Sequence, residues 1–139
     1  MNPVQGEILV IDGDDAVRAL IEQTLAQQGF TVTAVEDGGS ALRLIEAKPF
    51  ALVVTEVALP GPLDGITTMR QAKVRQPELK CLFTSGFAPA RLWNSVGLED
   101  YIAKPFRRRE LLGCVFELLQ RDAAADDVVV AEDLECSYR

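Results

Sequence analysis

Short apolar runs alternate with amphipathic segments along the chain, and this alternation restricts the possible folds more than any other feature. Five runs of aliphatic, β-branched and aromatic residues are typical of strands, at residues 7–11, 30–35, 50–55, 80–84 and 100–103. Segments with apolar residues at helical spacing follow them, at about 17–28, 41–45, 64–76, 89–94 and 107–121. Five strands that alternate with five helices predict an α/β fold, with a single doubly wound parallel sheet covered by helices on both faces.

The end of the chain differs in composition from the rest. Residues 122–139 hold six acidic residues and one basic residue, Arg139. Such an acidic segment is typical of a flexible tail. We therefore expect one domain at residues 1–121 and a flexible acidic tail at 122–139. The tail is too short for another folded domain, so we expect a stand-alone module.

Composition and charge exclude several classes of function. The net charge is −7, which argues against direct binding of nucleic acid through its phosphates. No apolar run approaches the roughly 20 residues of a membrane-spanning helix, and the N-terminus lacks the pattern of a signal peptide. The three cysteines are widely spaced, which favours a reducing cytoplasm with no disulfide framework or zinc site. The chain has no histidine and therefore no histidine phosphodonor.

Four polar residues stand where four of the predicted strands end. Asp12, Glu56, Thr84 and Lys104 each follow or close a different apolar run. The carboxyl ends of parallel strands meet at one edge of a sheet, and this edge is where such folds place their sites. We therefore expect two carboxylates, a hydroxyl and an ammonium to converge there.

Longer motifs surround these four residues: LVID at 9–12, VVTEVALPG at 53–61, LDG at 63–65, TSG at 84–86 and YIAKPF at 101–106. Together they resemble the receiver domain of bacterial response regulators, over about residues 7–121. The resemblance implies the flavodoxin-like receiver fold, with strand order 2-1-3-4-5. It also implies a part in two-component phosphorelay signal transduction, in the cytoplasm, as a signalling module and not an enzyme.

The resemblance implies a role for each residue of the site. In receivers an aspartate at the position of Glu56 accepts a phosphoryl group from the histidine of a sensor kinase. A Mg²⁺ ion assists, held by that aspartate and by an acidic pair that ends the first strand. A lysine at the position of Lys104 pairs with the phosphoryl group, and a hydroxyl at the position of Thr84 bonds to it. An aromatic residue at the position of Tyr101 then turns inward.

The resemblance also implies which surface meets partners. The inward turn of the aromatic residue reshapes the face made by the predicted helix 89–94, the strand 100–103 and the helix 107–121. We expect this face to contact a sensor histidine kinase or a downstream signalling protein, and to be able to form a homodimer. Neither a nucleic acid nor a membrane is an expected partner.

The chain departs from the receiver pattern at two chemical positions. Glu56 replaces the phosphoacceptor aspartate, and Gly13 replaces the second acid of the metal-binding pair. Asp12 remains, and Asp14 stands one residue further on. The first change removes the usual nucleophile and the second weakens the binding of Mg²⁺, which would activate it. Together they predict that standard phosphorylation has been lost.

The extra methylene of Glu56 suggests another role for its carboxylate. It moves the charged group about 1.5 Å outward, toward the expected place of a phosphoryl group and within reach of Lys104 and Thr84. A charge-assisted hydrogen bond there contributes roughly 1.5–3 kcal/mol. We therefore hypothesise that Glu56 holds the domain wholly or partly in an active-like arrangement without phosphate.

Other interpretations of the same residues stay open. The chain is a working phosphoacceptor if Asp12 and Asp14 together hold Mg²⁺. It is a haloacid-dehalogenase-like phosphatase if Asp12, in Asp12-Gly-Asp14, is a nucleophile, although that motif alone is weak. Asp14 is better explained as the cap of the helix that follows it. Thr84 and Tyr101 have structural interpretations too, as a strand-end hydroxyl and a packing residue.

Overall fold

The computed structural model of the chain describes residues 6–86 and 100–120. Their five strands form one parallel sheet in the order β2-β1-β3-β4-β5. The strands are β1 (Glu7–Ile11), β2 (Thr31–Val35), β3 (Leu52–Glu56), β4 (Lys80–Ser85) and β5 (Tyr101–Ala103). The helices are α1 (Asp15–Ala26), α2 (Gly38–Ala47), α3 (Gly65–Arg75) and α5 (Arg108–Gln120). The predicted fold class and strand order are confirmed. The predicted helix at 89–94 and the tail at 122–139 lie outside the described residues.

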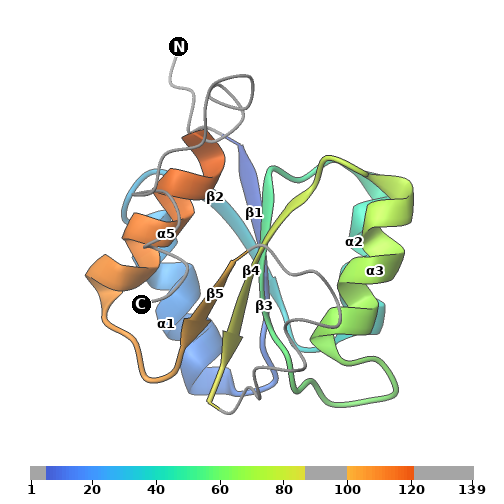
Figure 1. The fold of residues 1–139 in the computed structure, drawn as a ribbon, viewed down its shortest axis with the longest axis horizontal. Helices are drawn as coiled ribbons and strands as arrows, with labels where there is room; N and C mark the ends of the chain where they lie inside the picture. The colour runs from blue at the N-terminus through green and yellow to red at the C-terminus, as the bar shows by residue number, and fades with distance from the viewer. Residues whose placement is uncertain (1–5, 87–99, 121–139) are drawn as a thin grey trace.

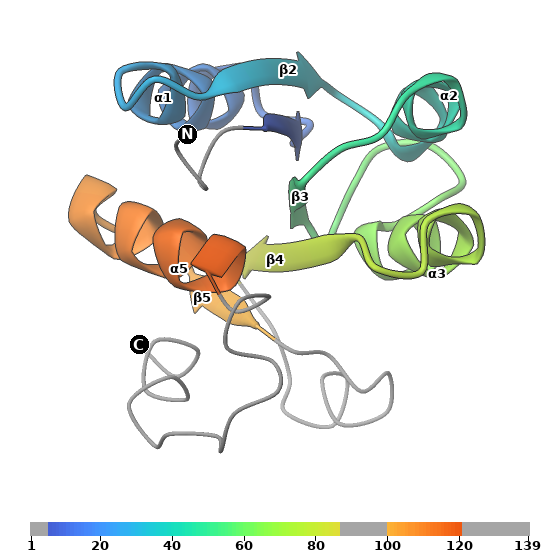
Figure 2. The same cartoon turned by 90° about the horizontal axis from the view of Figure 1, so that it is seen from above.

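Helices cover both faces of the sheet. Figures 1 and 2 show α1 and α5 on one face and α2 and α3 on the other. Side chains alternate between the faces: Ile8 and Val10 of β1 join the core cluster on the α1/α5 face, and Leu9 and Ile11 join the cluster on the α2/α3 face. Because both faces are buried, the central strands have continuous apolar sequences, as the pattern predicted.

Three helices begin directly after an aspartate that caps them. Asp14, Asp37 and Asp64 precede α1, α2 and α3, and the side chain of each accepts hydrogen bonds from backbone N–H groups of the first turn. These groups have no partner inside the helix, so the caps stabilise the helix starts. The predicted start of α2 at residue 41 is wrong for this reason, because Asp37 allows the helix to begin at Gly38.

The cysteines do not all match the expectation. Cys81 is free and buried, as expected of a small core residue. Cys114, on α5, is also buried but is disulfide-bonded, and its partner is outside the described residues. The expectation of a chain without a disulfide is therefore wrong at Cys114.

No helix in the described part of the chain has the length and apolar character needed to cross a membrane.

The glycine that begins α3 lies against the end of β3. A Cβ atom at Gly65 would stand 2.1 Å from the backbone oxygen of Glu56. We expect Gly65→Ala to lower the free energy of unfolding by about 1–3 kcal/mol, because the helix start or the strand end must move. Urea unfolding at equilibrium measures this change.

Gly113 provides the matched control. It lies inside α5, and a Cβ atom there would meet nothing within 4 Å. Gly113→Ala is expected to stabilise the fold by about 0.5–1 kcal/mol, through helix propensity alone. Equal effects of the two substitutions would contradict the proposed close approach at Gly65.

Candidate functional site

The four polar residues at the strand ends lie on one face of the sheet because strand side chains alternate with a period of two. Each stands two residues beyond a core residue of the α1/α5 cluster: Val10 for Asp12, Val54 for Glu56, Leu82 for Thr84 and Ile102 for Lys104. Parallel pairing places Glu56 directly beside Thr84. The backbone N–H of Lys104 donates to the Ser85 oxygen over 2.9 Å, which continues the pairing of β5 beyond its last residue.

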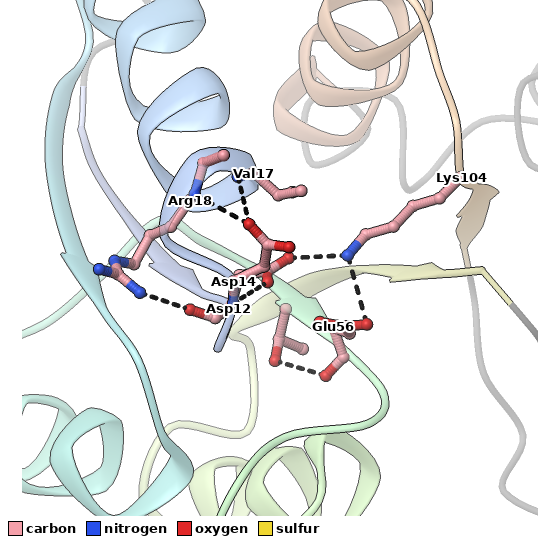
Figure 3. A network of polar contacts seen from close by, with 8 residues as sticks. Asp12, Asp14, Val17, Arg18, Glu56 and Lys104 are labelled. Atoms are coloured by element: carbon pink, nitrogen blue, oxygen red, sulfur yellow. Dashed lines mark hydrogen bonds and ion pairs between the residues drawn. The ribbon is translucent and has the colours of Figure 1, made fainter.

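The Lys104 ammonium joins the two carboxylates of this row. Its Nζ lies 3.0 Å from Asp12 Oδ2 and 3.3 Å from Glu56 Oε2. Figure 3 shows the lysine side chain reaching across from the end of β5 to the ends of β1 and β3. The Asp12 side chain is only 1% exposed, and those of Lys104 and Glu56 are 17% and 19% exposed. The structure thus brings together three of the predicted site residues in a largely buried ion cluster.

Asp12 is held on its other side by the backbone of the next loop. Its Oδ1 accepts a hydrogen bond from the Asp14 N–H over 2.8 Å. Its backbone oxygen accepts one from Arg18 Nη1 over 2.9 Å. With Asp14 N–H at Oδ1 and Lys104 Nζ at Oδ2, both carboxylate oxygens of Asp12 have a partner within the chain.

Asp14 serves as a helix cap. Its Oδ1 accepts from the N–H groups of Ala16, over 2.8 Å, and Val17, over 3.1 Å. These bonds, that from Val17 foremost, lower the pKa of the Asp14 carboxyl. Asp14 is exposed and points to the start of α1, as Figure 3 shows. Its geometry supports the structural interpretation over that of a metal ligand.

The charge of Glu56 is opposed by its surroundings. Burial is the main cause that raises the pKa of the Glu56 carboxyl above its ordinary value of 4.5, and the neighbouring Asp12 carboxylate adds to the effect. Lys104 acts in the opposite direction. The lysine is therefore what offsets the cost of two neighbouring carboxylates at this strand edge.

The Thr84 hydroxyl is different from the rest of the row. Thr84 is fully buried, and its Oγ1 has no hydrogen-bond partner among the described residues. A buried unsatisfied hydroxyl costs about 1–3 kcal/mol. Glu56 was expected to lie within reach of both Lys104 and Thr84. The structure shows the contact with Lys104 but no hydrogen bond to the Thr84 hydroxyl.

Tyr101 lies on the other face of the sheet. It is partly exposed, pairs in register with Phe83, and packs against the α2/α3 core cluster. The predicted contact face includes residues 89–94, which are outside the described residues. The role of Tyr101 as a switch, and dimerisation through this face, therefore stay predictions.

The side chains do not fit the Mg²⁺ site of a receiver. Mg²⁺ requires several oxygen ligands in near-octahedral geometry. Here an ammonium already lies between Asp12 and Glu56, Asp14 is engaged as a cap, and residue 13 has no side chain. Within residues 6–86 and 100–120 there is no group of three or more acidic, histidine or cysteine side chains suited to a metal ion.

The unpartnered hydroxyl leads to a test at two buried threonines. Thr84→Val is expected to be neutral or to stabilise the fold by about 1 kcal/mol, because it removes a buried hydroxyl without a partner. Thr55 is equally buried, but its Oγ1 donates to the Glu56 backbone oxygen over 3.0 Å. Thr55→Val should therefore cost about 1 kcal/mol. Chemical unfolding of both variants checks the difference, and a larger loss for Thr84→Val would contradict it.

The raised pKa of Glu56 predicts how stability depends on pH. A carboxyl whose pKa is higher in the folded state contributes stability below the unfolded value of 4.5, and that contribution is lost as the pH rises through the folded value. Wild type should therefore lose stability relative to Glu56→Gln as the pH rises from about 4 toward neutrality. Urea titrations across this range measure the difference.

Glu7 provides a control with the opposite sign. A hydrogen bond from the Thr33 hydroxyl, followed by one from Lys48, lowers the pKa of the Glu7 carboxyl. Its contribution is present above its unfolded value and is lost as the pH falls through the folded value. Wild type should lose stability relative to Glu7→Gln on acidification. Slopes of the same sign for the two glutamates would refute this assignment.

Comparisons with known proteins agree with the fold. The sequence model of the response regulator receiver domain matches residues 8–116. Protein PetR of Rhodobacter capsulatus is 34% identical over 116 residues, which are 82% of this chain and 48% of PetR. The response regulator receiver protein CpdR of Brucella abortus is 32% identical over 115 residues, which are 81% of this chain and 95% of CpdR. The chain thus spans about half the length of PetR but nearly all of CpdR.

Solved structures of response regulators have a similar fold. A response regulator receiver protein from Sinorhizobium medicae superposes with a TM-score of 0.76 at 32% identity, over 82% of this chain and 94% of that one. NtrX from Brucella abortus superposes with a TM-score of 0.80 at 28% identity, over 87% of this chain and 29% of NtrX. The chain belongs to the family of response regulator receiver domains, which act in two-component signalling.

Proposed function

We propose that this chain is a degenerate receiver that takes up no phosphoryl group and acts through contacts with other proteins, as a stand-alone module without enzymatic activity. The observation that carries the proposal is the 3.3 Å contact between Glu56 Oε2 and Lys104 Nζ. The family resemblance assigns this lysine to the phosphoryl group on the acceptor. In this chain Glu56, which stands at the acceptor position, itself forms the ion pair with Lys104.

The same contact makes Glu56 a poor acceptor. Phosphoryl transfer depends mainly on positioning and on cations that offset the charge of the transferred group. The extra methylene displaces the carboxylate by about 1.5 Å, and a misplacement of ~1 Å can cost on the order of 100-fold in rate. The side chains around Glu56 also do not fit Mg²⁺, because Lys104 pairs with Asp12 and Asp14 caps α1. A nucleophile out of place and without its metal supports a loss of phosphorylation.

The Glu56 carboxylate makes one of the two contacts that the resemblance assigns to a phosphoryl group. It pairs with Lys104, but the Thr84 hydroxyl has no partner among the described residues. The proposed state is therefore partly active-like, with the lysine contact fixed and the threonine contact open. Thr84 pairs in register with Ile102, which directly follows Tyr101. A ligand or side chain that moves the Thr84 hydroxyl can therefore also shift β5 at Ile102 and, through it, the neighbouring Tyr101.

The proposed partners follow from the family and from the charge. They are a sensor histidine kinase or a downstream signalling protein in the cytoplasm, with a homodimer through the β5 and α5 side as a further form. The net charge of −7 argues against nucleic acid as a direct partner. A membrane is not part of the proposal.

Two other functions compete with this proposal. A working phosphoacceptor would need Mg²⁺ on Asp12 and Asp14, but the Asp14 carboxylate caps α1. A haloacid-dehalogenase-like phosphatase would need Asp12 as a nucleophile, but both oxygens of this carboxylate are bonded, to the Asp14 N–H and to Lys104. Both alternatives predict activities that the following experiment measures.

The test is phosphoryl uptake from a small-molecule donor in the presence of MgCl₂. Intact-protein mass spectrometry should show no added phosphoryl group on wild type, because Glu56 is misplaced and paired with Lys104. Glu56→Ala, which removes the carboxylate, should behave in the same way. A typical receiver with an acceptor aspartate serves as the positive control for the donor.

The variants distinguish the alternatives. Uptake by wild type that Glu56→Ala abolishes would show a working acceptor and overturn the proposal. Uptake or phosphatase turnover that Asp12→Asn abolishes, while Glu56→Ala leaves it intact, would show that Asp12 is a nucleophile.

A further inference from the structure

We propose that Lys104 is the resident cation of this site, and that Pro60 closes the position where a second metal-binding carboxylate would stand. The strand edge would then neither require nor take up a divalent cation. This inference rests on the described contacts and goes beyond the proposed function, because it concerns what neutralises the site and not whether Glu56 accepts a phosphoryl group.

The strand edge carries two negative charges in a largely buried place. Asp12 and Glu56 place two carboxylates beside each other, one of them fully buried. Two like charges in such a place destabilise each other unless a cation lies near both. The Lys104 ammonium lies 3.0 Å from one and 3.3 Å from the other, and so supplies that cation.

The Lys104 ammonium takes up the space between these two carboxylates. A metal ion that used Asp12 Oδ2 and Glu56 Oε2 as ligands would have to bind between the same two oxygens that face Lys104 Nζ. A Mg²⁺ ion would also need Lys104 to withdraw, because its bonds to oxygen are only about 2.0–2.1 Å long. The other oxygen of Asp12 already accepts the Asp14 N–H. Lysine and metal therefore compete for one position.

Gly13 lies close to the ring of Pro60. The backbone of Gly13 does not have the positive φ that favours glycine, so its conformation does not exclude a side chain. A Cβ atom there would however stand 2.7 Å from Pro60 Cδ and 3.1 Å from Pro60 Cγ. The ring of a proline is fixed to its own backbone and cannot turn aside. A side chain at residue 13 therefore needs the loop after β3 to move.

The two contacts lead to the same conclusion. An acid introduced at residue 13 does not by itself restore a metal site. Pro60 obstructs its Cβ atom, and the Lys104 ammonium already lies between the carboxylates of Asp12 and Glu56. A divalent cation should bind when Lys104 is removed, or when the loss of the Pro60 ring lets a third carboxylate at residue 13 help the ion displace the Lys104 ammonium. This defines two independent routes by which the chain can regain a cation site.

The experiment measures thermal unfolding with millimolar MgCl₂, against NaCl at equal ionic strength to exclude simple screening. The melting temperature of wild type should be the same in both salts. Lys104→Gln should lower it, and MgCl₂ should restore part of the loss, since the ion takes the place of the ammonium. Lys104→Arg, which keeps the charge, should show no such dependence on Mg²⁺.

A second lysine provides a matched control. In the described part of the chain, Lys48 forms an ion pair with one carboxylate, through Glu7 Oε2 at 2.9 Å. Lys48→Gln removes a lysine charge in the same way but leaves no pair of carboxylates behind. Mg²⁺ should not restore the stability of Lys48→Gln. Equal restoration of the two variants would overturn the proposal.

Binding of Mn²⁺, followed by electron paramagnetic resonance, tests the second route. Wild type and Gly13→Asp should bind the ion weakly, and Gly13→Asp/Pro60→Ala should bind it at least about tenfold more tightly, or about 1.4 kcal/mol. Tight binding by wild type, or equal binding by Gly13→Asp and the double variant, would overturn the inference. This measurement uses the native Lys104, so it decides the question even if Lys104→Gln does not fold. Phosphoryl uptake remains a separate readout of the proposed function.

Discussion

The ion cluster of Lys104 with Asp12 and Glu56 joins parts of the sheet that no backbone ladder joins directly. Among the described residues the short strand β5 pairs only with β4, whereas Asp12 and Glu56 stand at the ends of β1 and β3. The lysine side chain reaches from the edge of the sheet back to its centre and satisfies two carboxylates there. Removal of a charged partner from such a buried cluster leaves the remaining charges uncompensated, which is far more costly than the loss of a surface pair.

Much of this site follows from the sequence through one simple rule. In a strand, residues two apart share a face, so a polar residue two positions after a core residue continues the same row. Asp12 follows Val10, and Lys104 follows Ile102, in this way. The alternation of strands and helices predicts the sheet, and parallel pairing predicts that the ends of its strands meet. The fold class and the convergence of charges were therefore accessible from the residues alone, whereas the strand order came from the resemblance to receiver domains.

Three details of the structure were not predicted, for different physical reasons. The approach of Pro60 to Gly13 joins two loops separated by most of the first half of the domain, and no local pattern fixes the distance between them. The missing hydrogen bond at Thr84 depends on where the Glu56 carboxylate turns, which its residue type does not determine. The early start of α2 had a local signal, the Asp37 cap, which the apolar periodicity of the helix did not include.

The two departures from the receiver pattern make sense together when they are considered as one electrostatic arrangement. A site that holds Mg²⁺ can support three carboxylates, because the ion carries two charges. This site has one lysine between two carboxylates, and a third acid at residue 13 would add charge that Lys104 does not offset. Glycine at that position avoids the third charge and admits the Pro60 ring. A glutamate at residue 56 then serves an ion pair rather than a reaction, because its longer side chain is suited to contact with a fixed ammonium and not to in-line attack on phosphorus.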